Sequence, residues 1–165
     1  MSRTRTGDLL DDTTRAIVEQ LQADGRRSFA AIGKAVSLSQ AATRERVHRL
    51  ISQGALQIVA ITDPLQLGFA RQAMIGIKVS GDVEAVAEQL IEISEIVYLV
   101  VTAGTYDLLV EVVVVDDEHL LELVNQRIRS IDGVMQSESF LYLRLMKQTY
   151  NWGTRPGRTG TAQGI

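Results

Sequence analysis

Cysteine is absent from the 165-residue sequence, and histidine occurs only at His48 and His119. Without cysteine the chain has no disulfide, no thiolate metal ligand and no cysteine nucleophile. The two histidines fall in different predicted domains, and no acidic partner recurs beside them at the spacing of a metal site. We therefore expect no metal and no cofactor.

Long apolar runs are absent as well. No stretch approaches the ~20 apolar residues of a membrane-spanning helix, and the first residues, MSRTRTGDLLDD, contain no apolar core of a signal peptide. Apolar residues nevertheless make up 45% of the sequence and charged residues 22%, a balance typical of a globular protein. The sequence therefore predicts a cytoplasmic protein without a membrane partner.

The charges are divided unequally along the chain. Residues 1–60 contain nine Lys and Arg against six Asp and Glu, a net charge of +3, whereas residues 61–165 contain eight against fourteen, a net charge of −6. Six basic residues lie between Arg26 and Arg49, with Glu45 as the only acid there. A basic head on an acidic body is typical of a protein that binds a polyanion at one end. A solvated, charged helix face is the alternative.

Residues 8–62 predict a winged helix-turn-helix domain with three helices. Asp11 is a good N-cap for the first helix, and Ser28 caps the second. After a brief turn, Ser39 caps a third helix that runs to about Gln53. The residues that follow, 55–62, alternate enough in polarity to predict a strand, which is the wing, and a linker over 63–71 comes next.

The third helix carries the side chains expected to contact DNA. Its first turns reach base edges when such a helix enters the major groove. Glutamine pairs with adenine and arginine with guanine, so we expect Gln40 and Arg44 to read bases. Arg46 and Arg49 lie on the flanks, where they suit phosphates or intramolecular ion pairs, and Arg26 precedes a helix N-terminus that can hold a phosphate. The expected DNA-binding residues are Arg26, Ser39, Gln40, Ala41, Arg44, Arg46, His48 and Arg49.

Residues 72–148 predict a second domain, which makes the whole chain an α+β protein. Apolar residues alternate or run continuously where strands are expected, and recur at helical spacing between them. This order, βαββαβ, is the ferredoxin-like arrangement, with four antiparallel strands and two helices on one face. The expected strands are 72–80, 96–102, 107–115 and 134–146, and the expected helices are 83–91 and 117–131.

The strands over 96–102 and 107–115 are apolar on both sides. A sheet face that is apolar but has no helices of its own needs a partner sheet. We therefore expect dimerisation through this face, which would place two recognition helices on DNA half-sites about one turn apart. The tail, 149–165, is rich in glycine and is expected to be partly disordered, with Trp152 a candidate contact to a neighbouring subunit.

Several short motifs follow one another in order over residues 9–147. They include Ala23-Asp24-Gly25-Arg26 before the second helix, Leu38-Ser39 at the third, Gly54-Ala55-Leu56 after it, Asp63-Pro64 in the linker and Gly104-Thr105-Tyr106-Asp107 in the second domain. In these motifs the sequence resembles the Lrp/AsnC family of feast/famine regulators. The resemblance implies a sequence-specific DNA-binding transcriptional regulator whose activity or assembly responds to a small effector, usually an amino acid. It also implies dimers that assemble further, often into octamers.

Carried over to this sequence, the resemblance places the effector beside Gly104, Thr105, Tyr106 and Asp107. The chemistry agrees, since Gly104 exposes backbone amides to a carboxylate and Asp107 can accept an ammonium group. A plain hairpin turn is the alternative. Thr105 stands where the family often has aspartate or another polar residue, which takes one anionic group out of the site.

An enzyme on the same scaffold, similar to the sirohaem decarboxylases, is the competing function. A substrate with many carboxylates needs several basic side chains that converge in the C-terminal half, where acids outnumber bases here. Candidates for general acid–base catalysis are scattered rather than paired. The sequence therefore predicts a regulator and not an enzyme.

Overall fold

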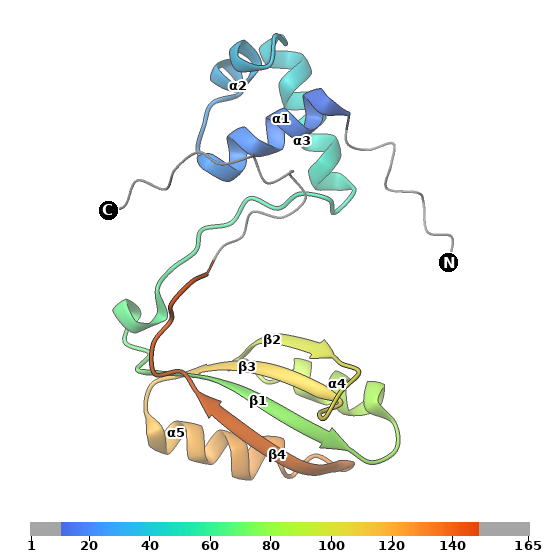
Figure 1. Ribbon diagram of the computed structural model, residues 1–165, viewed down its shortest axis with the longest axis vertical. Helices are drawn as coiled ribbons and strands as arrows, with labels where there is room; N and C mark the ends of the chain where they lie inside the picture. The colour runs from blue at the N-terminus through green and yellow to red at the C-terminus, as the bar shows by residue number, and fades with distance from the viewer. Residues whose placement is uncertain (1–10, 149–165) are drawn as a thin grey trace. The chain divides into compact units, whose positions relative to one another are not determined.

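The computed structural model describes residues 11–148. The chain divides into two compact units, and Ile61–Lys147 forms the second of them. Each unit is described by itself below (Figure 1). The expectations for 149–165, including Trp152, lie outside the described residues.

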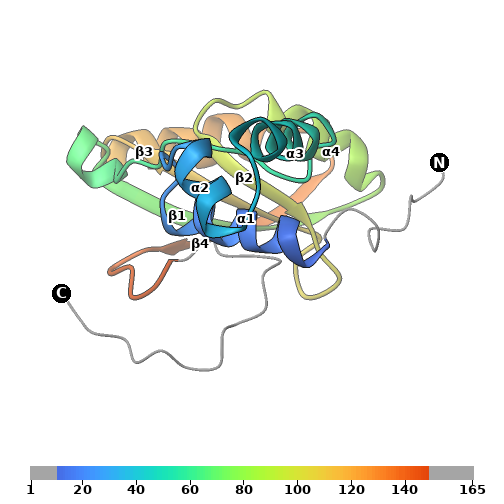
Figure 2. The ribbon, with the colours of Figure 1, turned by 90° about the horizontal axis from the view of Figure 1, so that it is seen from above.

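The first unit contains three helices that begin where the sequence predicted. At the start of each, a side-chain oxygen of Asp11, Ser28 or Ser39 accepts a hydrogen bond from a backbone N–H three residues later. These caps satisfy N–H groups that a helix leaves without partners in its first turn. The helices are α1 (Asp12–Ala23), α2 (Phe29–Ala35) and α3 (Gln40–Ser52), seen from a second direction in Figure 2.

Helices α2 and α3 meet closely across a short turn. A Cβ atom at Gly33 would lie 2.6 Å from the carbonyl oxygen of Leu38, so only glycine fits there without a shift of backbone. The core beneath consists of Ile17, Ile32 and Val47, all fully buried, with Leu21 beside them. The helix, brief turn and helix confirm the predicted helix-turn-helix.

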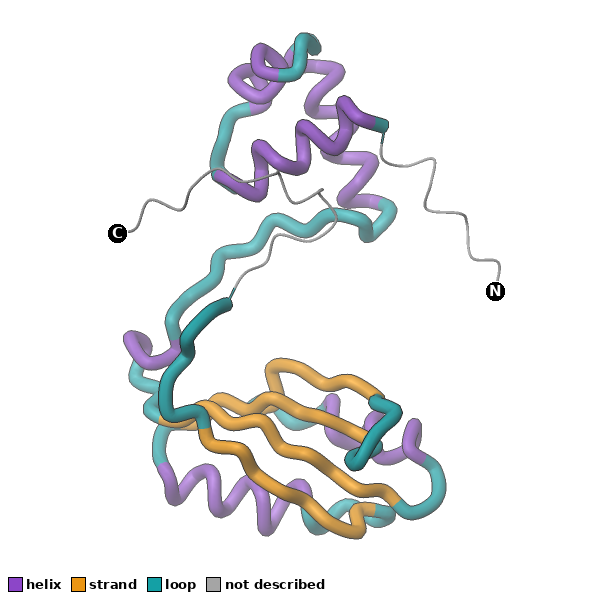
Figure 3. The backbone as a smooth tube through the Cα atoms, viewed as in Figure 1, coloured by secondary structure: helices purple, strands orange, loops and turns teal. Residues whose placement is uncertain are grey.

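The predicted strand over 55–62, the wing, is wrong for this chain. Figure 3 shows the segment after α3 as loop, and no strand among the described residues pairs with it. Alternating polarity is not sufficient for a strand, because extended backbone also needs a neighbour for its N–H and C=O groups. In the absence of one, Ile58, Val59 and Ile61 are exposed.

The second unit is a four-stranded antiparallel sheet in the order β2-β3-β1-β4. This order, with α4 and α5 on the same face of the sheet (Figures 1 and 2), confirms the ferredoxin-like prediction. The elements are a 3₁₀ turn (Pro64–Leu67), β1 (Arg71–Val79), α4 (Val83–Ile91), β2 (Ile96–Val101), β3 (Leu108–Val114), α5 (Asp117–Glu122), a π-helix (Leu123–Ile128) and β4 (Val134–Leu141).

Alternate residues of the two central strands form the core beneath the helices. Ile75 and Ile77 of β1 and Val110 of β3 are fully buried, and they pack with Leu90 of α4 and Leu123 of the π-helix. The helical segment expected over 117–131 is present, but its second half adopts the wider π-helical turn.

The fourth strand ends at Leu141 and not at Met146 as predicted. Leu141 pairs with Ala73, and the N–H of Tyr142 donates to the carbonyl of Gln72. Strand β1 begins at Arg71, one residue before Gln72, so almost no β1 backbone is left for the chain beyond Tyr142 to pair with. Leu143 is accordingly 92% exposed, because the alternation of apolar residues extends further than the available partner.

The sheet face away from the helices carries both apolar and polar side chains. The pairing register aligns Tyr98, Glu111, Met74 and Phe140 in one row across the four strands. Glu111 accepts a 2.6 Å hydrogen bond from the Gln72 amide. Burial, together with the neighbouring Glu111 carboxylate, raises the pKa of Tyr142. This open face is therefore less uniformly apolar than the sequence predicted.

Candidate functional site

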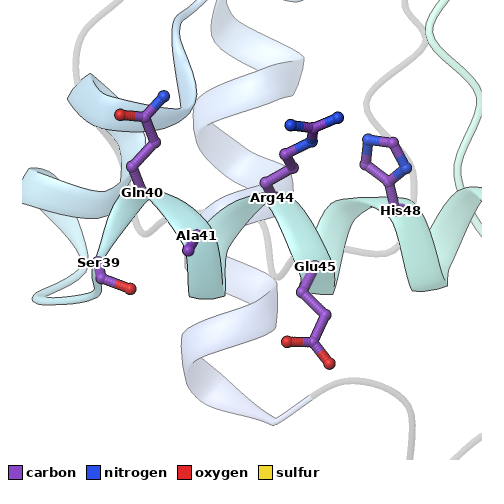
Figure 4. A pocket seen from close by; sticks show the side chains of 6 residues that line it. All are labelled: Ser39, Gln40, Ala41, Arg44, Glu45 and His48. Atoms are coloured by element: carbon purple, nitrogen blue, oxygen red, sulfur yellow. The ribbon is translucent and has the colours of Figure 1, made fainter.

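The exposed side of α3 forms an open hollow of about 730 Å³. Figure 4 shows its side chains in two directions: Gln40, Arg44 and His48 extend to one side, and Glu45 extends to the other. The residues that line the hollow are Ser39, Gln40, Ala41, Arg44, Glu45 and His48.

The rotation of α3 about its axis is fixed by three buried positions. Thr43 and Val47 are fully buried, and Leu50 nearly so. The Thr43 hydroxyl donates to the carbonyl of Ser39 at 2.9 Å, which satisfies that buried polar group within the helix. These contacts hold the first turns of α3 with the lining side chains directed outward.

The arginines of this unit differ in their availability. Within residues 11–148, the side chains of Arg26, Arg44 and Arg49 form no hydrogen bond or ion pair. The Arg46 guanidinium instead donates to both carboxylate oxygens of Asp11, at 2.7 and 2.9 Å, and to the Thr14 hydroxyl at 2.8 Å. Of the two roles that the sequence left open for Arg46, the structure shows the intramolecular ion pair.

The Asp11–Arg46 pair joins α3 to the N-cap of α1. Hydrogen bonds from Thr14 and Arg46 hold the pKa of the Asp11 carboxyl far below its usual value. A carboxyl with a lowered pKa in the folded state stabilises the fold above its ordinary pKa, and the contribution is lost as the pH falls through the lowered pKa. Both groups are partly solvent-exposed, so the contribution of the ion pair itself is small.

Arg46→Ala is expected to lower the melting temperature of the protein by a few degrees at pH 7, and by less in strong acid, as the pH falls through the lowered pKa of Asp11. Calorimetric melting curves of the two proteins at both pH values provide the measurement. DNA affinity at 25 °C should change no more than about twofold, since the guanidinium already has partners. A larger loss of DNA affinity in a folded variant would mean that Arg46 contacts phosphate.

A second group of predicted residues lies in the turn between β2 and β3. Two hydrogen bonds from Thr102 join the beginning of the turn to its end. The Thr102 N–H donates to the carbonyl of Asp107 at 2.8 Å, and the Thr102 hydroxyl donates to the carbonyl of Tyr106 at 2.5 Å. Asp107 is in turn bound to β1, because its Oδ2 accepts the N–H of Val79 at 2.9 Å. The hairpin turn that the sequence offered as the alternative is thus present, and Asp107 belongs to its framework.

Tyr106 and Gly104 have opposite surroundings within this turn. The Tyr106 ring lies on Gly76 of β1, where an added Cβ would be 2.5 Å from the ring, and it meets Phe140 edge to face at 6.2 Å. Gly104 is exposed, and a Cβ there would meet nothing within 4 Å. No neighbour requires glycine at 104, and the backbone there is accessible.

The structure thus brings the predicted residues into two groups, one on α3 and one in the 102–107 turn. Arg26 lies outside the hollow on α3. Two participants were not predicted: Glu45, which lines that hollow, and Gly76, on which Tyr106 lies. At 100° per residue, helical periodicity places Glu45 on the side of α3 away from the buried Thr43 and Val47. The position of Gly76 depends on a contact between strands that no local pattern encodes.

Each of the two structural units matches a known protein family model. An AsnC-type helix-turn-helix domain matches residues 10–51, and an Lrp/AsnC ligand binding domain matches residues 72–152. The transcriptional regulator FL11 of Pyrococcus furiosus is 33% identical over 143 residues, which cover 86% of this chain and 94% of that protein. The chain belongs to the Lrp/AsnC family. The resemblance found in the sequence is confirmed.

Two solved Lrp/AsnC structures have the same fold. The leucine response regulatory protein LrpA of Mycobacterium tuberculosis is 28% identical, with a TM-score of 0.78, and covers 86% of this chain and 98% of its own. A transcriptional regulator of Neisseria meningitidis, solved as a complex with L-Met, is 24% identical, with a TM-score of 0.77 and coverage of 85% and 94%. The similarity to the Neisseria regulator supports the fold and nothing more.

Membership of the Lrp/AsnC family makes this chain a transcriptional regulator with a DNA-binding helix-turn-helix and a ligand-binding domain. The related proteins are named as transcriptional regulators and not as enzymes, so the decarboxylase alternative has no support. Over residues 11–148, no helix is long and apolar enough to span a bilayer, and no three His, Asp or Glu side chains gather as metal ligands.

Proposed function

We propose that this Lrp/AsnC regulator binds specific duplex DNA by inserting the exposed side of α3 into the major groove. The observation that carries the proposal is the set of lining side chains on α3: they are capable of pairing with bases, and Arg44 has no partner within the described residues. Exposed arginines without partners add little to stability, whereas in a groove they bind guanine or phosphate.

The side chains have different roles in this proposal. Gln40 and Arg44 lie in the first turns of α3 and read base edges. Arg49, in the last turn, and Arg26, ahead of α2, bind phosphates. Ser39, Ala41 and His48 line the same hollow and lie close to the bases or sugars. Arg46 donates from Nη1 to Asp11 and Thr14, and we assign it the support of α1 in place of a phosphate contact.

The experiment that tests this proposal is selection from a randomised duplex library by the full-length protein, followed by titration of the selected duplex at several salt concentrations. We expect a preferred sequence and a steep fall of affinity with salt, because bound phosphates release counterions. The selection is repeated in the presence of each amino acid. Equal binding of selected and random duplexes in every condition would contradict the proposal.

We propose further that the effector is an amino acid and binds at the 102–107 turn. The exposed backbone at Gly104 suits a carboxylate, and Asp107 retains Oδ1 for an ammonium group, since only Oδ2 is used by Val79. Thr105 contributes a hydroxyl but no charge. The L-Met complex of the Neisseria regulator supports this chemical class for a related fold.

An Asp107→Asn variant is expected to bind the effector about tenfold or more weakly, because a hydrogen bond to a charged group contributes roughly 1.5–3 kcal/mol. Asparagine keeps a carbonyl oxygen for the Val79 N–H, so the turn itself is preserved. Calorimetric titration of the wild type with the twenty amino acids identifies the ligand, and the variant is titrated with that ligand.

Asp132→Asn is the control, since Asp132 is an exposed acid of the same domain far along the chain. Unchanged affinity in Asp107→Asn would remove Asp107 from the site. Failure of all twenty amino acids to bind the wild type would contradict the chemical class of the effector.

Self-association through the open sheet face is the third part of the proposal. Tyr98 and Phe140 are exposed on this face, and a second copy of the sheet would bury them. Glu111 accepts from the Gln72 amide, so burial of this pair would not leave the Glu111 carboxylate without a partner. Sedimentation equilibrium tests for a dimer and for larger assemblies such as octamers. Because its partner is chromosomal DNA, we place the protein in the cytoplasm.

A further inference from the structure

Glu45 is the charged side chain of α3 that points most directly away from the core. At 100° per residue, the direction opposite the mean of Thr43, Val47 and Leu50 passes within about 15° of Glu45, whereas Arg44 is roughly 90° away. Glu45 lies in the first half of the helix and lines its exposed hollow. Figure 4 shows its carboxylate on the side of α3 opposite Arg44 and Gln40.

The Glu45 carboxylate has no partner within residues 11–148 although cations surround it in sequence. Arg49, one turn later, is at the spacing of a helical ion pair, yet the two side chains do not meet. Arg46 is bound to Asp11 instead. The acid is thus available to an external group, in the most basic part of the chain.

A free carboxylate on a DNA-binding surface weakens attraction to phosphates, because like charges repel. A carboxylate at the centre of the face therefore needs a partner other than phosphate. The major groove offers two amine donors, N6 of adenine and N4 of cytosine, and the usual partner of a carboxylate there is the cytosine N4 amine. Glu45 is the only charged side chain of α3 that can accept a hydrogen bond, because the others are arginines, which only donate.

We propose that Glu45 is a specificity-determining residue that accepts a hydrogen bond from a cytosine N4 amine in each half-site. This inference rests on the proposed docking of α3 in the major groove. The same carboxylate disfavours non-specific complexes, in which it meets phosphates and no amine. Arg44 and Glu45, which carry opposite charges, then read adjacent parts of the site. The basic side chain contributes affinity, and the pair together contributes sequence specificity.

The test compares the sequences that wild-type protein and Glu45→Gln select from one randomised duplex library. The preference for a C·G pair at one position of each half-site should fall at least about fivefold in the variant and move towards A·T, because glutamine pairs with adenine. The other positions should keep their preferences. Affinity for random duplex should rise severalfold, because one negative charge is removed.

Glu19→Gln is the matched control, since it makes the same change at an exposed position of α1 outside the hollow, and it should select the wild-type sequence. Equal melting temperatures of the three proteins exclude a folding effect. An unchanged profile in Glu45→Gln would overturn the inference, as would a rise in affinity that is uniform over all positions. A wild-type protein that selects no sequence would instead overturn the docking proposal itself.

Discussion

Arg44→Ala is expected to bind the selected duplex roughly 5- to 150-fold more weakly than the wild type, while its affinity for random duplex falls by less, because only one positive charge is lost there. A bidentate arginine–guanine pair contributes about 1–3 kcal/mol of discrimination against the wrong base. Arg44 has no partner among residues 11–148, so its truncation leaves no group of the protein unsatisfied and the loss belongs to the complex. Fluorescence anisotropy titrations of both duplexes provide the measurement.

Arg49→Ala separates this effect from general electrostatics. Arg49 is equally free but lies in the last turn of α3, outside the hollow. Its loss should weaken binding to all sequences alike and reduce the slope of log affinity against log salt by about 1. If Arg44→Ala and Arg49→Ala behaved identically, the division between base reading and phosphate binding would be wrong.

Local chemistry in the sequence was sufficient for the three helices and for the outward side of α3. N-caps such as Ser39 act within three residues of themselves, and the buried positions Thr43 and Val47 follow directly from helical periodicity. The same periodicity placed Glu45 outward. It was nevertheless not among the expected DNA-binding residues.

Pairing between distant segments was beyond local patterns. The wing over 55–62 and the end of β4 were mispredicted because alternation reports which side chains are apolar, but not whether a neighbouring backbone is present. Arg46 reaches Asp11 across 35 positions of sequence. Asp107, expected to be available to a ligand, also accepts an N–H from β1. For both Arg46 and Asp107, the folded structure provides a hydrogen-bond partner that local sequence patterns do not indicate.

Gly76→Ala is expected to destabilise the ligand-binding domain by about 1–3 kcal/mol and to weaken effector binding about tenfold. The new methyl group would lie 2.5 Å from the Tyr106 ring, so the ring must move, and overpacking of this kind carries that cost. Tyr106 precedes Asp107 in the turn, and its displacement shifts the backbone that is proposed to hold the carboxylate. Urea unfolding and calorimetric titration measure the two effects.

Gly104→Ala is the matched control for stability in the same turn. A Cβ there meets nothing within 4 Å, so stability should stay within about 0.5 kcal/mol of the wild type. The single variant Tyr106→Leu and the double variant with Gly76→Ala complete a double-mutant cycle. With the tyrosine ring removed, Gly76→Ala should no longer destabilise the domain. If Gly76→Ala remained as harmful without the ring, the collision with Tyr106 would not be the cause. If it left effector binding intact despite the loss of stability, the position of the turn would not depend on Tyr106.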